Sequence, residues 1–349
     1  MLKLGIIGQA RSGKTTIYNA VAAAQADVDA YMAPTEIRRT VVKVPDPRLD
    51  RLFDMFQPPK KVHAEIEYVD FPAMTGDADE VNALPREVRD LDALIMVLRE
   101  FGDNADPVAQ SRALREELIL ADLGVIEKRL TRLEKEVASG RTENQVEHDA
   151  LVRCRQALES ERPIRSVELS LHERKLLHGY GFLSGMPLLA VINASDSGSK
   201  AVEEDWAARL DLGPHSMVRV VRGKLEGELN DLPEEDRSAF MADLGLAHSA
   251  LDGMIASSYS LLGLITFFTG GSEKDVHAWT VESGAKAPQA AGVIHSDLER
   301  GFIRAEVTPV DDLISLGSLA ATRKAGKTRL EGKEYTVVDG DYILFRFNV

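Results

Sequence analysis

Short continuous runs of apolar residues recur along the chain and predict the strands of a buried sheet. They lie at Leu4–Ile7, Ala93–Leu98, Pro187–Ile192 and Val218–Val221. An alanine-rich segment, Thr16–Ala24, follows the first run and is typical of a helix. Strands and helices in this arrangement indicate an α/β domain.

A different pattern marks the segment between the first two runs. Apolar and polar side chains alternate along Val62–Val69, which is the period of a half-buried strand. Thr40–Val44 has the composition of another strand, and Arg48–Phe56 that of a helix after the turn at Pro45–Pro47. Two strands so close in sequence are expected to pair at one edge of the sheet.

A long helical insertion separates the second and third runs. Its first half has apolar residues spaced three and four apart, the seam of a coiled coil, at Leu123, Ile126, Leu130, Leu133 and Val137. A second apolar helix is expected over Asn144–Glu159, after a break at Gly140. The pattern predicts an antiparallel helical hairpin. It leaves open whether the hairpin folds onto the core or forms an arm that meets a partner.

The C-terminal third changes character and predicts a small α+β domain. An apolar run, Leu261–Phe268, is followed by short segments that alternate with glycine and aspartate turns. One short helix is expected at Asp311–Leu319, and strands at His277–Val281, Phe302–Val307, Tyr335–Val338 and Tyr342–Phe347. Metal-ligand spacing is absent from this third, because His277 and His295 have no cysteine or paired carboxylates around them.

Candidate chemistry begins directly after the first strand. Gly8 to Thr15 reads GQARSGKT, which is the phosphate-binding motif G-x-x-x-x-G-K-[ST]. The two glycines let the backbone bend around phosphates, so that its N–H groups point inward at the anion. Lys14 can reach the terminal phosphates, and the Thr15 hydroxyl can ligate Mg²⁺. The motif therefore predicts nucleotide binding.

Two further residues are candidates for the Mg²⁺ site. Asp70 follows a predicted strand, where phosphate-loop proteins place a carboxylate that holds the metal. Thr35 lies in an aperiodic segment where a first switch would complete the metal shell. A capping aspartate and an ordinary loop threonine are the alternatives.

The third buried strand is followed by Asn193-Ala194-Ser195-Asp196. Guanine-specific proteins of this kind carry Asn-Lys-x-Asp here, and the aspartate accepts the N1 and N2 hydrogens of guanine. This chain has the asparagine and the aspartate but lacks the lysine. Gly223 and Lys224 lie where a second base-contacting loop is usual. Base identity stays open on this pattern.

Composition narrows the classes of function. The chain has 349 residues, a formal net charge of −14 and one cysteine, Cys154. An internal disulfide is therefore impossible, and a reducing cytoplasm fits. The acidic balance argues against bulk binding of nucleic acid and against sequence-specific DNA binding, and leaves room only for a local patch. Because apolar runs stay well short of the ~20 residues of a membrane span, no membrane partner is expected.

Several stretches resemble the Obg-like ATPase (YchF) family. The resemblance is strongest near the C-terminus, in LLGLITFFTGG, HAWTVESGAKAPQAAGVIHSDLERGFIRAEV and RLEGKEYTVVDGDYILFRFNV. VPDPRLDRL and ELSLHERKLL also resemble the family, so that with the phosphate loop the likeness spans nearly the whole chain.

The resemblance implies an α/β P-loop NTPase (GTPase-like) domain with a helical coiled-coil insertion, followed by a small α+β β-grasp (TGS) domain. The expected boundaries are 1–108 and 180–262 for the first, 109–179 for the insertion and 263–349 for the last. The phosphate-loop positions of the family carry over onto Arg11, Ser12, Gly13, Lys14, Thr15 and Thr16.

The family implies slow hydrolysis of ATP in preference to GTP, with Mg²⁺ as cofactor, and association with the ribosome or its large subunit. It lacks a catalytic glutamine after its second switch motif, and Met74 falls at that position here. Lys14 then stays as the catalytic residue, and activation by a partner is expected.

This chain departs from the family in three places. The second switch is shorter and reads DFPAMTGDADE, without the glycine- and lysine-rich loop. The base motif ends in Asp196 where the family has glutamate, and an ungapped match puts the switch threonine at Pro34 rather than Thr35. Three hypotheses follow: a slow ATPase that acts as a ribosome-associated switch, a nucleotide-gated binding protein with little hydrolysis, and a conventional GTPase.

Overall fold

The computed structural model describes residues 2–23, 37–72, 86–138, 144–197, 199, 201–243 and 249–348. Within this part the chain divides into two compact units. The first comprises Met1–Val42 and Glu67–Ser257, and the second Lys43–Ile66 and Ser258–Val349. The expected three-part division of the chain stays a prediction.

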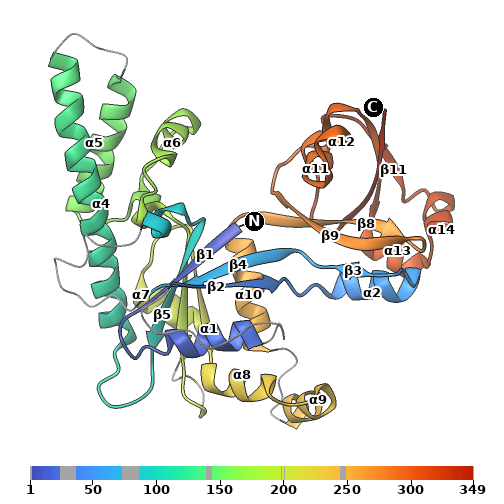
Figure 1. Ribbon diagram of the computed structural model, residues 1–349, viewed down its shortest axis with the longest axis horizontal. Coiled ribbons are helices and arrows are strands. Elements are labelled where there is room, and N and C mark those ends of the chain that lie inside the picture. Colours follow the sequence, from blue (N-terminus) through green and yellow to red (C-terminus); the bar gives the residue numbers. More distant parts are fainter. Residues whose placement is uncertain are drawn as a thin grey trace. The chain divides into compact units, whose positions relative to one another are not determined.

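The first unit is built on a six-stranded sheet with strand order β2-β4-β1-β5-β6-β7 (Figure 1). Its strands are β1 (Leu2–Ile7), β2 (Arg38–Lys43), β4 (Glu65–Asp70), β5 (Ala93–Arg99), β6 (Leu188–Asn193) and β7 (Ser216–Val221). The four predicted buried runs are β1, β5, β6 and β7, and these pair in parallel. Parallel pairing brings their carboxyl ends to one edge of the sheet, where ligands bind in open α/β folds.

The structure also contains the helices that follow these strands in the chain. They are α1 (Lys14–Ala23), α4 (Pro107–Ala138), α5 (Gln145–Glu159), α6 (Leu171–His178), α7 (Glu203–Leu210), α8 (Gly223–Asn230), α9 (Glu234–Asp243) and α10 (Ala250–Leu261). Short 3₁₀ turns lie at Arg86–Asp90, Ile164–Ser166 and Leu183–Gly185. Helices α1 and α8 lie side by side, and α4 packs near β5 and α7 (Figure 1).

The predicted helical hairpin is formed by α4 and α5, whose far ends extend past the sheet (Figure 1). Ile126, Leu130 and Leu133 of the predicted seam are fully or almost fully buried. They pack with Leu151 and Cys154 of α5. Each such buried leucine or isoleucine contributes about 2 kcal/mol, so the seam is enough to hold the two helices together.

The second unit contains a six-stranded mixed sheet with strand order β11-β10-β12-β8-β9-β3. Its strands are β3 (Lys61–Val62), β8 (Leu264–Gly271), β9 (Lys274–Glu282), β10 (Phe302–Pro309), β11 (Arg329–Glu331) and β12 (Asp341–Phe347). Its helices are α2 (Pro47–Phe56), α11 (Ala287–Ile294), α12 (Ser296–Arg300), α13 (Val310–Leu316) and α14 (Leu319–Lys324). The parallel pairing of β8 with β12 at the centre, with antiparallel neighbours outside, is the β-grasp arrangement.

Three local predictions are wrong. The segment Val62–Val69 is two strands rather than one, because β3 leaves the first sheet and pairs in parallel with β9. Tyr335–Val338 is not a strand. Its backbone bonds to residues beside the start of α11 instead, with Val337 N donating to the Ala285 carbonyl oxygen at 2.9 Å. The C-terminal third holds four short helices rather than one within its described residues.

Candidate nucleotide-binding site

The predicted phosphate-binding motif, Gly8–Thr15, runs from the end of β1 into the start of α1 at the carboxyl edge of the first sheet. Gly13 has φ of 86° and Arg11 has φ of 63°, both in the left-handed region. A Cβ on Gly13 would lie 1.9 Å from Asn193 Nδ2. A Cβ on Gly8 would lie 2.9 Å from the Val97 carbonyl oxygen. Glycine at these two positions therefore lets the loop pass close to β5 and β6.

Asn193, the last residue of β6, holds the loop in place. Its Nδ2 donates to the Ser12 carbonyl oxygen at 3.2 Å, and its Oδ1 accepts from the Gly223 backbone N–H at 3.2 Å. The residue is 3% exposed. One buried amide thus joins the loop, β6 and the start of α8, which are distant in sequence.

Lys14 and Asp70 meet beneath the loop. The Lys14 Nζ donates to the Phe71 carbonyl oxygen and lies 3.6 Å from Asp70 Oδ1. Both side chains are buried, and burial lowers the pKa of the Lys14 ammonium, although the nearby Asp70 charge opposes the shift. The Lys14 side chain is therefore held at the end of β4 by its contacts with Phe71 and Asp70.

A third charged residue joins this pair. Arg38, the first residue of β2, forms an ion pair with Asp70 Oδ2 through its NH2. Its guanidinium lies 4.5 Å from the centre of the Tyr18 ring and donates to Asn19 Oδ1 at 3.2 Å. Asp70 Oδ1 remains buried without a hydrogen bond in the described part of the chain.

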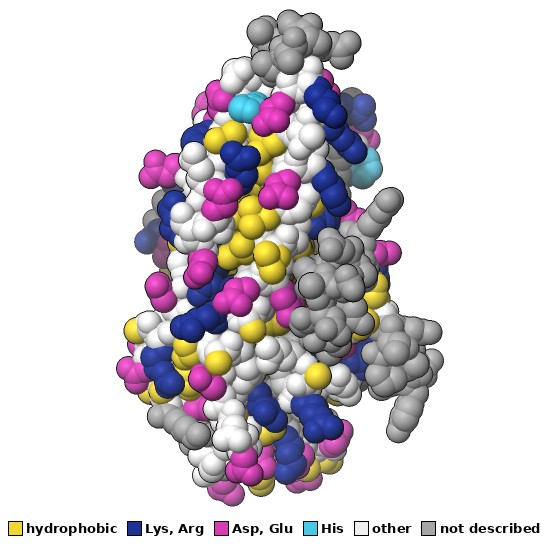
Figure 2. Space-filling view, turned by 90° about the vertical axis from the view of Figure 1, so that its left-hand side faces the viewer, with side chains coloured by type: hydrophobic (Ala, Val, Ile, Leu, Met, Phe, Trp, Pro, Cys, Tyr) yellow, Lys and Arg dark blue, Asp and Glu magenta, His cyan; other side chains and the backbone are white. Residues whose placement is uncertain are grey.

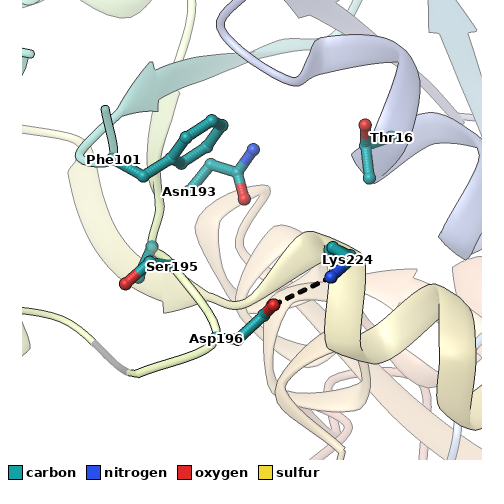
Figure 3. A pocket seen from close by; sticks show the side chains of 7 residues that line it. Thr16, Phe101, Asn193, Ser195, Asp196 and Lys224 are labelled. Atoms are coloured by element: carbon teal, nitrogen blue, oxygen red, sulfur yellow. Dashed lines mark hydrogen bonds and ion pairs between the residues drawn. The ribbon is translucent and has the colours of Figure 1, made fainter. Parts of the chain in front are cut away.

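A cavity of about 320 Å³ lies beside Asn193 and Thr16 (Figure 3). It is lined by Thr16, Phe101, Asn193, Ala194, Ser195, Asp196 and Lys224. Figure 3 shows the Lys224 side chain of α8 directed at Asp196, whose Oδ2 accepts from Lys224 Nζ at 3.0 Å. The cavity thus has an aromatic ring from the β5 side and an exposed ion pair between the segment after β6 and α8.

Comparisons with known proteins identify the family of this chain. The chain is 40% identical to "Ribosome-binding ATPase YchF" of Bacillus subtilis (strain 168) over 369 residues, which covers 100% of both proteins. The chain belongs to the YchF family. It is also 34% identical to "Obg-like ATPase 1" of Caenorhabditis elegans, covering 99% of this chain and 92% of that protein.

Structure and domain comparisons extend the YchF relationship. The solved structure titled "Structure of the Schizosaccharomyces pombe YchF GTPase" aligns with a TM-score of 0.81 and 27% identity, covering 99% of this chain and 97% of that one. The family model YchF-GTPase_C, described as "Protein of unknown function (DUF933)", matches residues 264–348. The predicted fold class is confirmed: a P-loop domain with a helical insertion and a C-terminal TGS domain.

The structure brings most of the predicted site residues of this YchF chain to one edge of the sheet. Ser12, Gly13 and Lys14 lie in the loop, and Thr15 and Thr16 are exposed at the start of α1. Asn193, Asp196, Gly223 and Lys224 line or support the cavity, as described above. The Arg11 side chain is exposed at the tip of the loop, and Thr35 lies outside the described residues.

Sequence reasoning missed two residues of this region. Phe101 could have been found, because it follows a buried strand whose carboxyl end was expected at the site. Arg38 had no local signal, since its role depends on which strand lies beside β2. Among the described residues, no cluster of three or more His, Cys, Asp or Glu side chains suits a metal ion. The described helices are likewise too short or too polar to cross a membrane.

Proposed function

We propose that this protein is a slow, Mg²⁺-dependent P-loop NTPase that converts ATP and water to ADP and phosphate, as a nucleotide-dependent switch at the ribosome. One observation carries the proposal. Asn193 fixes the phosphate loop beside Lys14 and Asp70, so that a phosphate-binding loop, a buried cation and a buried carboxylate converge. This combination suits the charged end of a nucleoside triphosphate.

The phosphates would lie within the loop. Its backbone N–H groups and the N-terminus of α1, a helix of ten residues, favour negative charge there. Lys14 would exchange the Phe71 carbonyl oxygen for the β- and γ-phosphate oxygens and stabilise the charge that develops as the terminal phosphoryl group leaves. Arg11, Ser12 and Thr16 are the remaining loop contacts that we assign to the nucleotide.

Mg²⁺ fits the residues beside the loop. The buried Asp70 Oδ1 has no hydrogen bond in the described part of the chain, and carboxylate and hydroxyl oxygens are the ligands that Mg²⁺ prefers. Thr15 and Asp70 would hold the ion, and Thr35 is the third proposed ligand. The bound ion would neutralise charge on the phosphate oxygens.

The cavity beside Phe101 would take the base. The aromatic ring offers a stacking surface, and Asp196 with Lys224 lies at the polar side. Gly223 supports the cavity through its bond to Asn193. Because Lys224 already engages the Asp196 carboxylate, guanine would have to compete for it, which favours ATP.

Association with the ribosome is proposed because several relatives are named "Ribosome-binding ATPase YchF". The helical hairpin offers a contact surface. Figure 2 shows hydrophobic side chains among charges of both signs on the side where the hairpin lies, and Leu120 and Val146 are 60% and 45% exposed. The TGS domain is the second proposed contact. A ribosome-associated role places the protein in the cytoplasm.

The deciding experiment measures phosphate release from ATP with and without ribosomes, for wild type and Lys14→Ala. We expect slow release by wild type, faster release with ribosomes, and loss of release in the variant. Equal rates of phosphate release for the two proteins would refute the proposal that the protein is an enzyme. If wild type binds ATP yet releases no phosphate, the protein is a nucleotide-gated binding protein.

Base preference needs a separate measurement, which is equilibrium binding of fluorescent ATP and GTP analogues with Mg²⁺. We expect tighter binding of ATP, and little change in Asp196→Glu. Lys224→Ala should shift the preference toward GTP by no more than about fivefold, because an exposed ion pair is weak. Tighter GTP binding that Asp196→Glu weakens would make the protein a GTPase.

A further inference from the structure

The Asp70 carboxylate carries two cations of the chain itself. Arg38 pairs with its Oδ2, and Lys14 Nζ lies 3.6 Å from its Oδ1. The Asp70 and Lys14 side chains are 6% and 8% exposed, and that of Arg38 is 13% exposed. In such a buried place, charge–charge interactions are screened little by solvent. The carboxylate is therefore compensated before any ligand arrives.

Arg38 also contacts two residues other than Asp70. Its guanidinium lies against the Tyr18 ring at 4.5 Å and donates to Asn19 Oδ1 at 3.2 Å. Both partners belong to α1, the helix that begins at the phosphate loop. Arg38 could release Asp70 and keep these two contacts, so its movement away from the carboxylate costs only part of its interactions.

We infer that Arg38 is an internal counter-cation of Asp70 that competes with Mg²⁺ for this carboxylate. The inference rests on the proposed function, in which Asp70 holds the metal. A guanidinium and a divalent cation on one carboxylate repel each other strongly at low dielectric. Mg²⁺ alone would therefore gain little by binding at Asp70. A nucleoside triphosphate would draw Lys14 away from the carboxylate and add the negative charge that keeps Mg²⁺ and Arg38 in the site.

This arrangement makes metal binding conditional on nucleotide. In the nucleotide-free protein, Arg38 and Lys14 compensate the charge of Asp70, which would disfavour the binding of free Mg²⁺. In the nucleotide complex, Arg38 would release Asp70 and keep its contacts with Tyr18 and Asn19, and Asp70 would be free to hold Mg²⁺. Arg38 is thus a positioning residue, which acts on the metal through Asp70.

The test is the Mg²⁺ concentration that half-saturates binding of a fluorescent ATP analogue. Arg38→Ala should lower it by at least about tenfold, because the change removes a cation that repels Mg²⁺ at this buried carboxylate. Arg39→Ala is the matched control. Arg39 is the next residue of β2, but its side chain is 45% exposed and pairs with Glu67 at 3.5 Å, so wild-type behaviour is expected.

A second readout needs no nucleotide. Mg²⁺ alone should leave the melting temperature of wild type and Arg39→Ala unchanged. It should raise that of Arg38→Ala, in which Asp70 keeps only Lys14 as a counter-charge and gains a second cation from the solution. If Arg38→Ala does not fold, Arg38→Gln replaces it in both measurements. Direct titration of the nucleotide-free wild type with Mn²⁺ should show no binding at Asp70. The Asp70→Asn variant should therefore bind as much Mn²⁺ as wild type.

The outcomes separate the two proposals. If wild type does not bind the ATP analogue, the proposed function fails. If wild type binds it, but the Arg38 variants need as much Mg²⁺ as Arg39→Ala, the counter-cation inference is overturned and the proposed function stands. One-to-one Mn²⁺ binding by nucleotide-free wild type that depends on Asp70 also overturns the inference.

Discussion

Asn193 Nδ2 donates to the carbonyl oxygen of Ser12 at 3.2 Å, across 181 positions of sequence. The same amide accepts from Gly223, so its two ends fix both walls of the candidate site. The sequence pattern predicts that Asn193 lies beside the base. In the structure its side-chain amide hydrogen-bonds to the protein backbone instead.

Asn193→Ala should weaken binding of ATP and GTP alike, because the change frees the phosphate loop rather than a contact specific to one base. A buried backbone group that loses its partner costs about 1–3 kcal/mol, so we expect a loss of affinity on the order of tenfold. Equilibrium binding of fluorescent analogues measures it. Ser195→Ala, in the same cavity, is the control, and equal affinities for the two variants would contradict the prediction.

Gly13→Ala should abolish nucleotide binding and destabilise the fold. Its φ of 86° is strained for alanine, and the new Cβ would lie 1.9 Å from Asn193 Nδ2. Such strain costs about 1–3 kcal/mol in a denaturant titration. Gly227→Ala is the control with the opposite sign. This glycine lies inside α8 with nothing within 4 Å of an added Cβ, so a gain of about 0.5–1 kcal/mol is expected.

Glu147 should make the stability of the hairpin depend on pH. Its carboxylate accepts from Arg129 Nε and NH2 of α4 at 2.9 and 2.7 Å and from the Tyr180 hydroxyl. The Arg129 hydrogen bonds lower the pKa of Glu147 below its usual 4.5, against the effect of burial. The stabilisation is therefore complete above the unfolded-state pKa and is lost as pH falls through the lowered folded-state value.

Glu147→Gln should accordingly reduce the free energy of unfolding by on the order of 1 kcal/mol at pH 7, and by less as the pH falls below about 4. Denaturant titrations of the variant and wild type, at pH 7 and at a second pH value below about 4, measure the difference in the free energy of unfolding. Glu134→Gln, at an exposed position of α4, should change little at either pH. A loss in Glu147→Gln that is the same at both pH values would show that the carboxylate charge is not involved.

Cys154 should resist thiol reagents in the folded protein. It is fully buried within the hairpin seam, and burial raises the pKa of its thiol to about 11. At pH 8 this pKa leaves about one thiolate per thousand molecules, which is the reactive form. A colorimetric thiol assay should detect no rapid reaction in buffer and one thiol per chain in denaturant. Rapid labelling of the native protein would mean that the hairpin opens readily.

Much of the fold follows from local patterns. The apolar runs predicted β1, β5, β6 and β7, because a continuous apolar segment of about four to eight residues has the length and composition of a strand buried in a sheet. The three-four spacing predicted the hairpin, since that period places one apolar face along each helix. The phosphate loop was readable because its glycines, lysine and threonine lie within eight positions of sequence.

Pairing between distant segments could not be read in this way. The alternation of Val62–Val69 says that one face is buried, but not against which sheet, and β3 finds its partner in β9. Tyr335–Val338 has the composition of a strand, yet its backbone bonds go to the segment before α11. A side-chain pattern specifies burial, whereas a hydrogen-bond partner depends on which other segments reach the same place.

The candidate site shows the same division. By itself, the sequence determined that Lys14, Thr15 and Asp70 follow strands whose carboxyl ends could converge. Only the tertiary structure decided that Arg38 pairs with Asp70 and that Asn193 holds Ser12. These contacts join residues 32 and 181 positions apart. Their partners are selected by strand order and by burial, which withdraws water and leaves each charge or amide to the nearest protein group.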